Sequence, residues 1–389
     1  MKNKLCLLAV CAVMTSFAHA QSSVTLYGDL DTSIGSFSGQ KGANSSGTSI
    51  GMHSGAVTPD VWGLKGREDL GGGLSAVFQV ESEFNINTGS LGSNNSSNNG
   101  VFGRTSMVGL SDQSLGTVTV GRQFDPLVDL ITPLTEYPTF GNGFATPGDI
   151  DNYGSSYSTD NSIKYASPNY NGLQWSAMYA FGGQAGALGG GQTYAFAAQY
   201  SNGPASFAAG YFRASNNGTT GTFDGLNSAN VDSQAISGGF TSASSTQIIR
   251  AAGDYAVGPF NLGLSYSNVD YSNYATALGS GNDARFNTGQ FYVNYHANPA
   301  TVLGFGYDYT KGSGSGVNAI YNQFSLGADY ALSKRTDLYA LAGYQRARGN
   351  TINGSTGQVT VANASFSDFG NDASGDSQTM VLFGIRHKF

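Results

Sequence analysis

The dominant pattern in this chain is an alternation of apolar and polar residues that recurs in short runs along its length. The run VTLYGDLDTSI, residues 24–34, places aliphatic residues on one face of an extended chain and a tyrosine with two aspartates on the other. Successive side chains of a β-strand point to opposite faces, so this period of two predicts strands with one apolar and one polar face. The run also reaches the roughly 9–11 residues that a tilted strand needs to cross a bilayer.

Composition separates a membrane barrel from other classes of protein. The 389 residues include 56 glycines, 23 phenylalanines and 22 tyrosines, and 11% are charged. Disordered chains lack such aromatic content, and no apolar run beyond residue 20 is long enough for a membrane helix. A soluble sandwich ordinarily has strands of about 5–6 residues, whereas many of these runs reach nine or more. A transmembrane barrel turns its apolar face to lipid and its polar face to a lumen. The net charge of −7 disfavours nucleic acid as a partner.

The first 20 residues have the pattern of a secretory signal peptide. Two lysines precede the apolar stretch Leu5–Met14, and Ala18-His19-Ala20 follows as a small-residue cleavage site. Cleavage would remove Cys6 and Cys11, so the exported chain would contain no disulfide. We therefore predict a signal peptide over residues 1–20 and a single barrel domain over residues 21–389.

The runs and their connections predict an all-β fold of about 16 antiparallel strands. A polar stretch that ends near Ala56 is predicted to be the first long loop. Long polar connections alternate with short turns, and this inequality between the two rims is typical of bacterial outer-membrane barrels. The short turns are expected near Gly71, Ser114, Pro168, Gly203, Gly258, Asn298 and Ser333.

One connection, residues 124–160, differs from all the others. It contains four of the nine prolines and six carboxylates, and it lies between the alternating runs 116–122 and 161–167. A structureless connection of this length is uncommon in a compact domain and usually has a function. We predict that it folds inward and narrows the lumen of the barrel.

The C-terminal run VLFGIRHKF alternates apolar and polar residues and ends in the aromatic residue Phe389. Together with SSVTLYGDLD, GLKGREDLGGGLSAVFQVE, FGRTSMVGL, GTVTVGRQFDP and NSIKYASPNYNGL, it resembles the general (non-specific) porins of Gram-negative bacteria, of the beta-proteobacterial and neisserial type. This resemblance implies a homotrimer of 16-stranded transmembrane β-barrels in the outer membrane. It also implies an inward-folded third extracellular loop and a water-filled channel for passive diffusion of small hydrophilic solutes and ions. The expected partners are outer-membrane lipid, including lipopolysaccharide, and the barrel-assembly machinery, which would read Phe389.

In that family a basic cluster on the barrel wall faces carboxylates on the inserted loop, and rings of charge at a narrow point select ions. The motifs GLKGRED and FGRTS match the basic wall positions, and their alternation points these side chains away from the lipid face. The face on which Arg122 lies is ambiguous, because alternation places it on the same side of the strand as the apolar Val118 and Val120. The candidate wall cations are Lys65, Arg67, Arg104 and Lys164, and the candidate loop acids are Asp125, Asp129, Glu136, Asp149 and Asp151.

The sequence contains no recognisable catalytic, cofactor or metal site. His53 is expected on the opposite side of the membrane from His296 and His387, and no nucleophile stands out. A histidine base needs its partner within hydrogen-bond reach. We therefore expect no enzyme and no cofactor. Two other functions remain open: a substrate-selective channel of the same fold, and a surface-binding or adhesin barrel whose loops matter more than its lumen.

Overall fold

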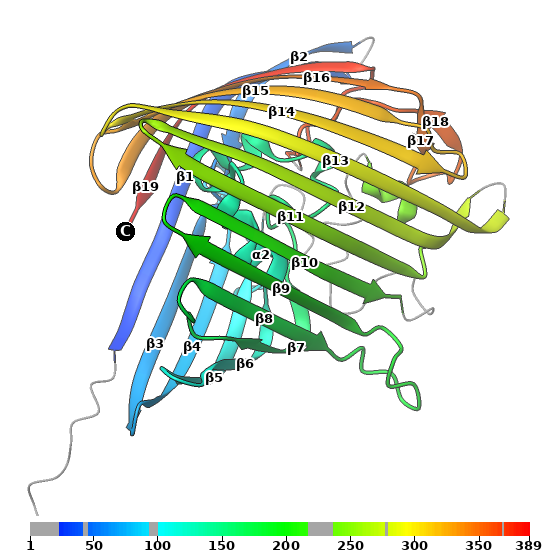
Figure 1. Cartoon of the computed structure of the whole chain (residues 1–389). Helices are drawn as coiled ribbons and strands as arrows, with labels where there is room; N and C mark the ends of the chain where they lie inside the picture. Colours follow the sequence, from blue (N-terminus) through cyan, green and yellow to red (C-terminus); the bar gives the residue numbers. More distant parts are fainter. Residues whose placement is uncertain (1–22, 42–45, 93–99, 217–235, 277–278, 368) are drawn as a thin grey trace, which may run out of the picture.

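The computed structural model describes residues 23–41, 46–92, 100–216, 236–276, 279–367 and 369–389. The predicted signal peptide and the asparagine-rich stretch 94–99 lie outside these residues. Figure 1 shows that the described chain forms a ring of tilted strands. Within the described residues, no helix has the length and apolarity needed to cross a membrane.

Antiparallel strands form the wall, and the ring closes where β1 pairs with β19. The sheet contains 17 strands, but β2 and β3 pair with successive halves of β1 and occupy one position, which leaves 16 positions in the ring and confirms the prediction. The wall strands are β1 (Ser23–Lys41), β2 (Ser46–Ser54), β3 (Val61–Gly71), β4 (Leu74–Glu83), β5 (Thr105–Asp112), β6 (Gly116–Gln123), β7 (Thr159–Ala166), β8 (Leu173–Ala180), β9 (Thr193–Asn202), β10 (Ala205–Ser215), β11 (Ser245–Val257), β12 (Phe260–Thr276), β13 (Gly279–Asn298), β14 (Thr301–Gly314), β15 (Ile320–Ala331), β16 (Thr336–Arg348) and β19 (Ser377–Lys388).

The predicted first long loop was wrong, because β1 continues to Lys41 and β2 follows over Ser46–Ser54. The outward residues of β2, Ile50 and Met52, are 79% and 58% exposed, but the surrounding glycines and serines hid this alternation. The strand is interrupted between β2 and β3. There the carboxylate of Asp31 accepts hydrogen bonds from the amides of Val57 (2.6 Å) and Thr58 (2.7 Å). The connections β12–β13 and β14–β15, on the rim where long loops were expected, are also short: β12 ends at Thr276 and β13 begins at Gly279, and β14 ends at Gly314 and β15 begins at Ile320.

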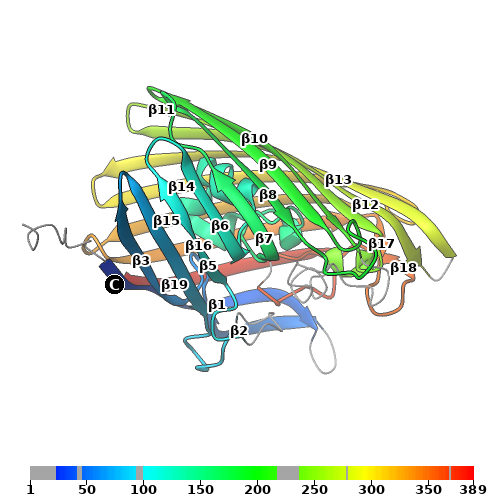
Figure 2. The same ribbon diagram turned by 90° about the horizontal axis from the view of Figure 1, so that it is seen from below.

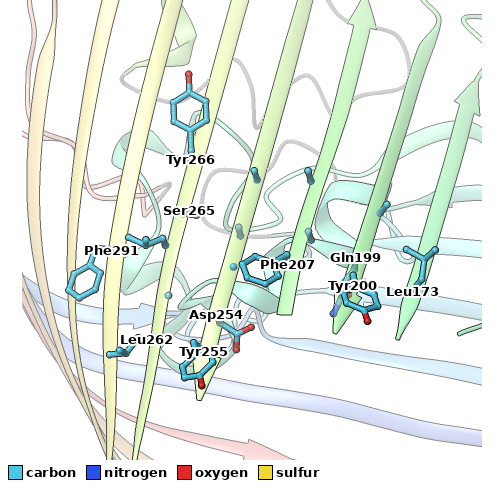
Figure 3. A pocket seen from close by; sticks show the side chains of 18 residues that line it. Leu173, Gln199, Tyr200, Phe207, Asp254, Tyr255, Leu262, Ser265, Tyr266 and Phe291 are labelled. Atoms are coloured by element: carbon cyan, nitrogen blue, oxygen red, sulfur yellow. The ribbon is translucent and has the colours of Figure 1, made fainter. Parts of the chain in front are cut away.

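The alternation read from the sequence sorts side chains between the two faces of the wall. Outward residues such as Phe207 and Leu264 are more than half exposed, whereas inward residues such as Gln323 and Gln345 are buried. On the outer face of β8–β13 lies an apolar hollow, in which Tyr200, Phe207 and Tyr266 surround small residues (Figure 3). Its floor includes the register neighbours Ala198, Ala209 and Ala251. No residue of the loop 124–160 lines this hollow.

The connection between β6 and β7 is a chain of short helical turns, not the structureless stretch that was expected. Figures 1 and 2 show these turns surrounded by the strands of the wall. They are α2 (Pro126–Leu130), η1 (Thr132–Leu134), α3 (Tyr137–Phe140), η2 (Gly141–Phe144) and η3 (Pro147–Asp149). Two other connections contain short elements: η4 (Ser237–Phe240) lies between β10 and β11, and the hairpin β17 (Asn350–Ile352) with β18 (Val359–Val361) lies between β16 and β19.

Candidate pore constriction

The loop 124–160 begins with a capped helical turn. The side chain of Asp125 accepts hydrogen bonds from the backbone amides of Leu127 (2.7 Å) and Val128 (3.4 Å). An aspartate at the N-cap satisfies amides that have no partner within the helix, and Pro126 at the first helical position has none to satisfy. Leu127 then packs against β10 at Gly210, where a larger residue would collide with it. The sequence DPLVD therefore turns the chain from β6 toward the opposite wall.

Two aromatic residues fix the middle of the loop to the far wall. The rings of Phe140 and Phe144 are stacked, with centroids 5.0 Å apart, and both side chains are buried. Phe140 occupies the space above Gly304 and Gly327, and Phe144 lies above Gly306. Glycines on the inner faces of β14 and β15 thus form a floor on which the aromatic pair rests. Glycine in a strand often marks such a close approach.

Buried polar side chains of the wall bind the loop backbone. The amide of Gln290 on β13 donates to the carbonyl of Phe144 (2.9 Å), and that of Gln323 on β15 donates to the carbonyl of Ala145 (2.8 Å). These inward positions carry amide side chains, which satisfy loop carbonyls that would otherwise be buried without a partner. The loop is therefore attached to inward-facing wall residues by specific hydrogen bonds.

The tip of the loop reaches the break between β2 and β3. Gly141 lies so close to the carbonyl of Val57 that an added Cβ would overlap it, and its φ of 53° also favours glycine. The side-chain amide of Asn142 donates to the carbonyl of Gly55 (3.3 Å). The loop therefore extends from β6 along the inner wall to the strand position next to β1.

One predicted wall cation meets one predicted loop acid. The ammonium of Lys164 on β7 lies 2.6 Å from the carboxylate of Asp129 and also donates to the carbonyl of Phe124 (2.8 Å). Lys164 is mostly buried, whereas Asp129 is about one-third exposed. This pair joins the start of the loop to the wall.

Arg104 binds acids of the wall rather than acids of the loop. It precedes β5 instead of lying in mid-strand, and its guanidinium contacts the carboxylates of Glu81 (2.8 Å) and Glu83 (3.1 Å). The hydroxyl of Tyr27 also donates to Glu81 (2.8 Å), and the guanidinium lies 4.8 Å from the ring centroid of Phe124. The two glutamates were not among the predicted site residues, although their alternation already placed them on the polar face of β4.

Lys65 and Arg67 lie on β3 and are exposed. The ammonium of Lys65 is 5.0 Å from the ring centroid of Tyr27, which is a cation–π distance. Arg67 pairs across the sheet with Val77 on β4, close to the short turn between these strands. Both side chains share the inward parity of Gly63, where an added Cβ would lie 2.7 Å from the Tyr27 hydroxyl.

The remaining predicted acids accept hydrogen bonds from neutral groups. Glu136 accepts one from the amide of Asn294 on β13 (3.0 Å), and burial raises its pKa to about 8. Asp149 accepts from the amide of Gly154 (2.6 Å) and from the hydroxyl of Ser156. Asp151 accepts from the hydroxyl of Thr146 (2.7 Å). These carboxylates shape the loop and its docking.

Two further arginines join the loop to the wall. Arg122 forms an ion pair with Asp160 (2.5 Å) beside a register shift at Gly121, whose φ is 130°. This irregularity is why its alternation could not be interpreted from the sequence. Arg250 on β11 is buried, and its guanidinium lies 3.4 Å from both the Thr132 hydroxyl and the Asn152 carbonyl. Among the described residues, no cluster of three or more metal-binding side chains occurs.

Comparison with known proteins gives one consistent result. Residues 7–350 match the family described as Gram-negative porin. An outer membrane porin protein of Bordetella pertussis is 31% identical, and the alignment covers 89% of this chain and 94% of that protein. Outer membrane porin protein 32 of Delftia acidovorans is 28% identical over the full length of both. The solved anion-selective porin from Comamonas acidovorans has a TM-score of 0.70 at 23% identity, covering 95% of this chain and 100% of that one, which shows the shared fold.

Proposed function

This chain belongs to the Gram-negative porins, which are channels of the outer membrane, and we propose that its loop 124–160 narrows a water-filled pore for small hydrophilic solutes and ions. The observation that supports the narrowing most directly is the attachment of the loop backbone to inward-facing side chains, Gln290 and Gln323. A loop bound to the inner wall reduces the free cross-section, and solutes then cross by diffusion at a rate set by their size and charge.

The charge at the proposed constriction comes mainly from the wall. Arg104 and Lys164 are each compensated by contact with carboxylates, whereas Lys65 and Arg67 are exposed on β3. Exposed charges at a narrow point act on passing ions more strongly than compensated pairs, because a close pair has little net field beyond its own dimensions. Lys65 and Arg67 are therefore the side chains that most directly attract anions.

The protein works as a homotrimer in this proposal. Its exposed outer face is apolar, as lipid contact and packing against neighbouring barrels both require. Residues 1–20 direct export and are removed. The barrel-assembly machinery then recognises Phe389, which is 42% exposed next to Gly28 of the first strand.

Single-channel recording of refolded protein in a planar bilayer with a KCl gradient tests this function. Conductance in groups of three equal steps is expected for a trimer of open pores. Deletion of residues 133–146 should enlarge each step, because the loop then no longer crosses the lumen. A folded barrel that passes no ions would contradict the diffusion pore and would favour a surface-binding role.

A further inference from the structure

The charged residues of β14, β15 and β16 separate by sign between the two faces of the wall. These strands lie side by side (Figure 1). Their carboxylates all lie on the inward face: Asp308, Asp329 and Asp337. Their cations are all exposed on the outward face: Lys311, Arg346 and Arg348. In a chain with a net charge of −7, composition alone does not explain a group of exposed cations on the lipid side of the wall.

These outward cations begin where the apolar band of the outer face ends. On β14 the exposed Phe305 and Tyr309 precede Lys311 in the same alternation. On β16 the exposed Tyr344 precedes Arg346. Both strands start at a short turn and end on the opposite rim, and in outer-membrane barrels the short turns are periplasmic. Aromatic residues mark the edge of the hydrocarbon layer, so the cations lie at the level of the headgroups of the outer leaflet.

The charge of these cations is not compensated by close protein anions. Within the part of the chain that the structure describes, neither Lys311 nor Arg348 forms an ion pair. Arg346 is 3.7 Å from the carboxylate of Asp376, and both side chains are about half exposed. The outward Arg285 on β13 differs, because it binds both carboxylate oxygens of Asp270, at 2.7 and 3.1 Å. The structure therefore leaves Lys311 and Arg348 accessible to an anion from outside the protein.

The two unpaired cations lie on one line across the strands. The register pairs Lys311 with Ile320 of β15, and Ile320 with Arg348 of β16. Neighbouring strands are about 4.8 Å apart, so the two backbone positions are separated by about 10 Å. Arg346 lies on the same face, two positions closer to the apolar band. A guanidinium binds phosphate through two parallel hydrogen bonds, and an ammonium binds it as a point charge. This spacing suits two phosphate groups of one headgroup.

We propose that Lys311 and Arg348, together with Arg346, bind the two phosphate groups of a diphosphorylated glycolipid in the outer leaflet. Charge complementarity provides the attraction. The exposed rings of Phe324 and Tyr344, which are paired in the register, provide apolar surface for the acyl chains. The site lies on the outside of the barrel and is separate from the constriction loop, residues 124–160. It therefore goes beyond the diffusion function and does not require an open pore.

Binding of the refolded protein to diphosphoryl lipid A in detergent micelles tests the proposal. The double variant Lys311→Gln, Arg348→Gln should raise the Kd about tenfold or more, because each cation near an anionic lipid surface adds to the attraction. The matched control Lys334→Gln, Arg335→Gln removes the same two charges from the exposed short turn between β15 and β16, on the opposite rim. This control should bind as tightly as the wild type.

Changes to the lipid separate the role of the phosphates from that of the acyl chains. Lipid A freed of both phosphates should bind the wild type as weakly as intact lipid A binds the double variant. Micelles containing phosphatidylglycerol, which carries one phosphate, should bind more weakly than diphosphoryl lipid A. Added salt should weaken binding of the wild type more than binding of the double variant, because mobile ions screen exposed charges.

The outcomes are separable. Equal affinity of wild type and double variant, or of lipid A with and without phosphates, would overturn the site. Equal affinity for phosphatidylglycerol would overturn the assignment of a diphosphorylated ligand. If the double variant does not fold, the single variant Arg348→Gln applies the same test, and an unchanged Kd would overturn the proposal equally. A wild-type barrel that binds the lipid through these cations but passes no ions would support the site and contradict the diffusion pore.

Discussion

The ammonium of Lys164 and the carboxylate of Asp129 lie 2.6 Å apart and join strand β7 to the first helical turn of the constriction loop. The two side chains differ in exposure, since Lys164 is mostly buried and Asp129 is partly open to solvent. A pair of this kind contributes little to stability when exposed, and more when one partner cannot be solvated after the other is removed.

Removal of one partner from this pair should shift ion selectivity in a direction set by the charge that remains. Asp129→Asn leaves the Lys164 cation and should favour anions, whereas Lys164→Met leaves the carboxylate and should favour cations. The reversal potential in a KCl gradient measures both shifts. The double variant should return close to the wild-type value, and a double variant as selective as either single one would contradict the pairing.

Neutralisation of Lys65 and Arg67 should shift the pore toward cations. Both side chains are exposed on β3, so the double variant Lys65→Gln, Arg67→Gln should lower the anion-to-cation permeability ratio about twofold, by removing charge near the proposed constriction. The shift should decrease at high salt, because mobile ions screen exposed charges within about 10 Å at 0.1 M. An unchanged reversal potential would show that these residues lie away from the ion path.

Arg104→Gln should act on stability more than on selectivity. This change leaves the mostly buried Glu81 and Glu83 without their cation, at a cost of about 3 kcal/mol for a broken buried pair. Denaturation of the refolded barrel measures this loss. Simultaneous replacement of Glu81 and Glu83 by glutamine should recover much of it, and a triple variant no more stable than Arg104→Gln would count against this explanation.

Docking of the loop should weaken at high pH because of Glu136. Burial raises the pKa of this loop carboxyl from 4.5 to about 8. Between these values the folded protein retains a proton that the unfolded chain has lost, so stability falls as the pH rises through this window. Wild-type channels should become noisier above pH 8, where the buried carboxylate becomes charged.

The variant Glu136→Gln keeps a neutral side chain at every pH and should abolish this dependence. The exposed control Glu68→Gln on β3 should leave the wild-type profile intact. Current noise recorded from pH 6 to pH 9 measures the effect. A Glu136→Gln variant with the same pH profile as the wild type would exclude Glu136 as its origin.

The glycine floor beneath Phe140 should not tolerate a larger side chain. An added Cβ at Gly304 would overlap the Phe140 ring, so Gly304→Ala should displace the loop, raise conductance and cost about 1–3 kcal/mol of stability. Gly289 on the neighbouring β13 has no atom within 4 Å of the corresponding position. Gly289→Ala is therefore the matched control. Equal conductance in both variants would mean that Phe140 does not position the loop.

The alternation of apolar and polar residues predicted the strands of the barrel wall well, because it is a property of each strand alone. The closed ring of 16 positions follows from it, and β2 was missed only because glycine and serine concealed the outward Ile50 and Met52. Partner choice was harder to predict. Whether Arg104 binds Glu81 or a loop acid depends on the β4–β5 register, in which Glu81 pairs with Thr105.

The contact of the loop with the connection between β16 and β19 could not be predicted either. The contact of Gly148 with Ser365 joins segments that are far apart in the chain. Neither segment has a sequence pattern that predicts the other as its partner. Four of the five predicted acids likewise accept hydrogen bonds from amides or hydroxyls, which spacing alone does not reveal. The sequence identified the charged residues of the loop and the wall, but their partners depend on tertiary packing.

The pairing of β1 with β19 has a consequence for how the protein reaches this state. Until those two strands meet, each presents an edge of unsatisfied amides and carbonyls, which cannot be tolerated in hydrocarbon and which invites association with other chains. The register pairs Asp31 of β1 with Arg386 of β19, so closure of the ring is among the most non-local contacts of the fold. An unclosed ring is therefore prone to aggregation, and the cell must protect the chain until β1 and β19 have paired.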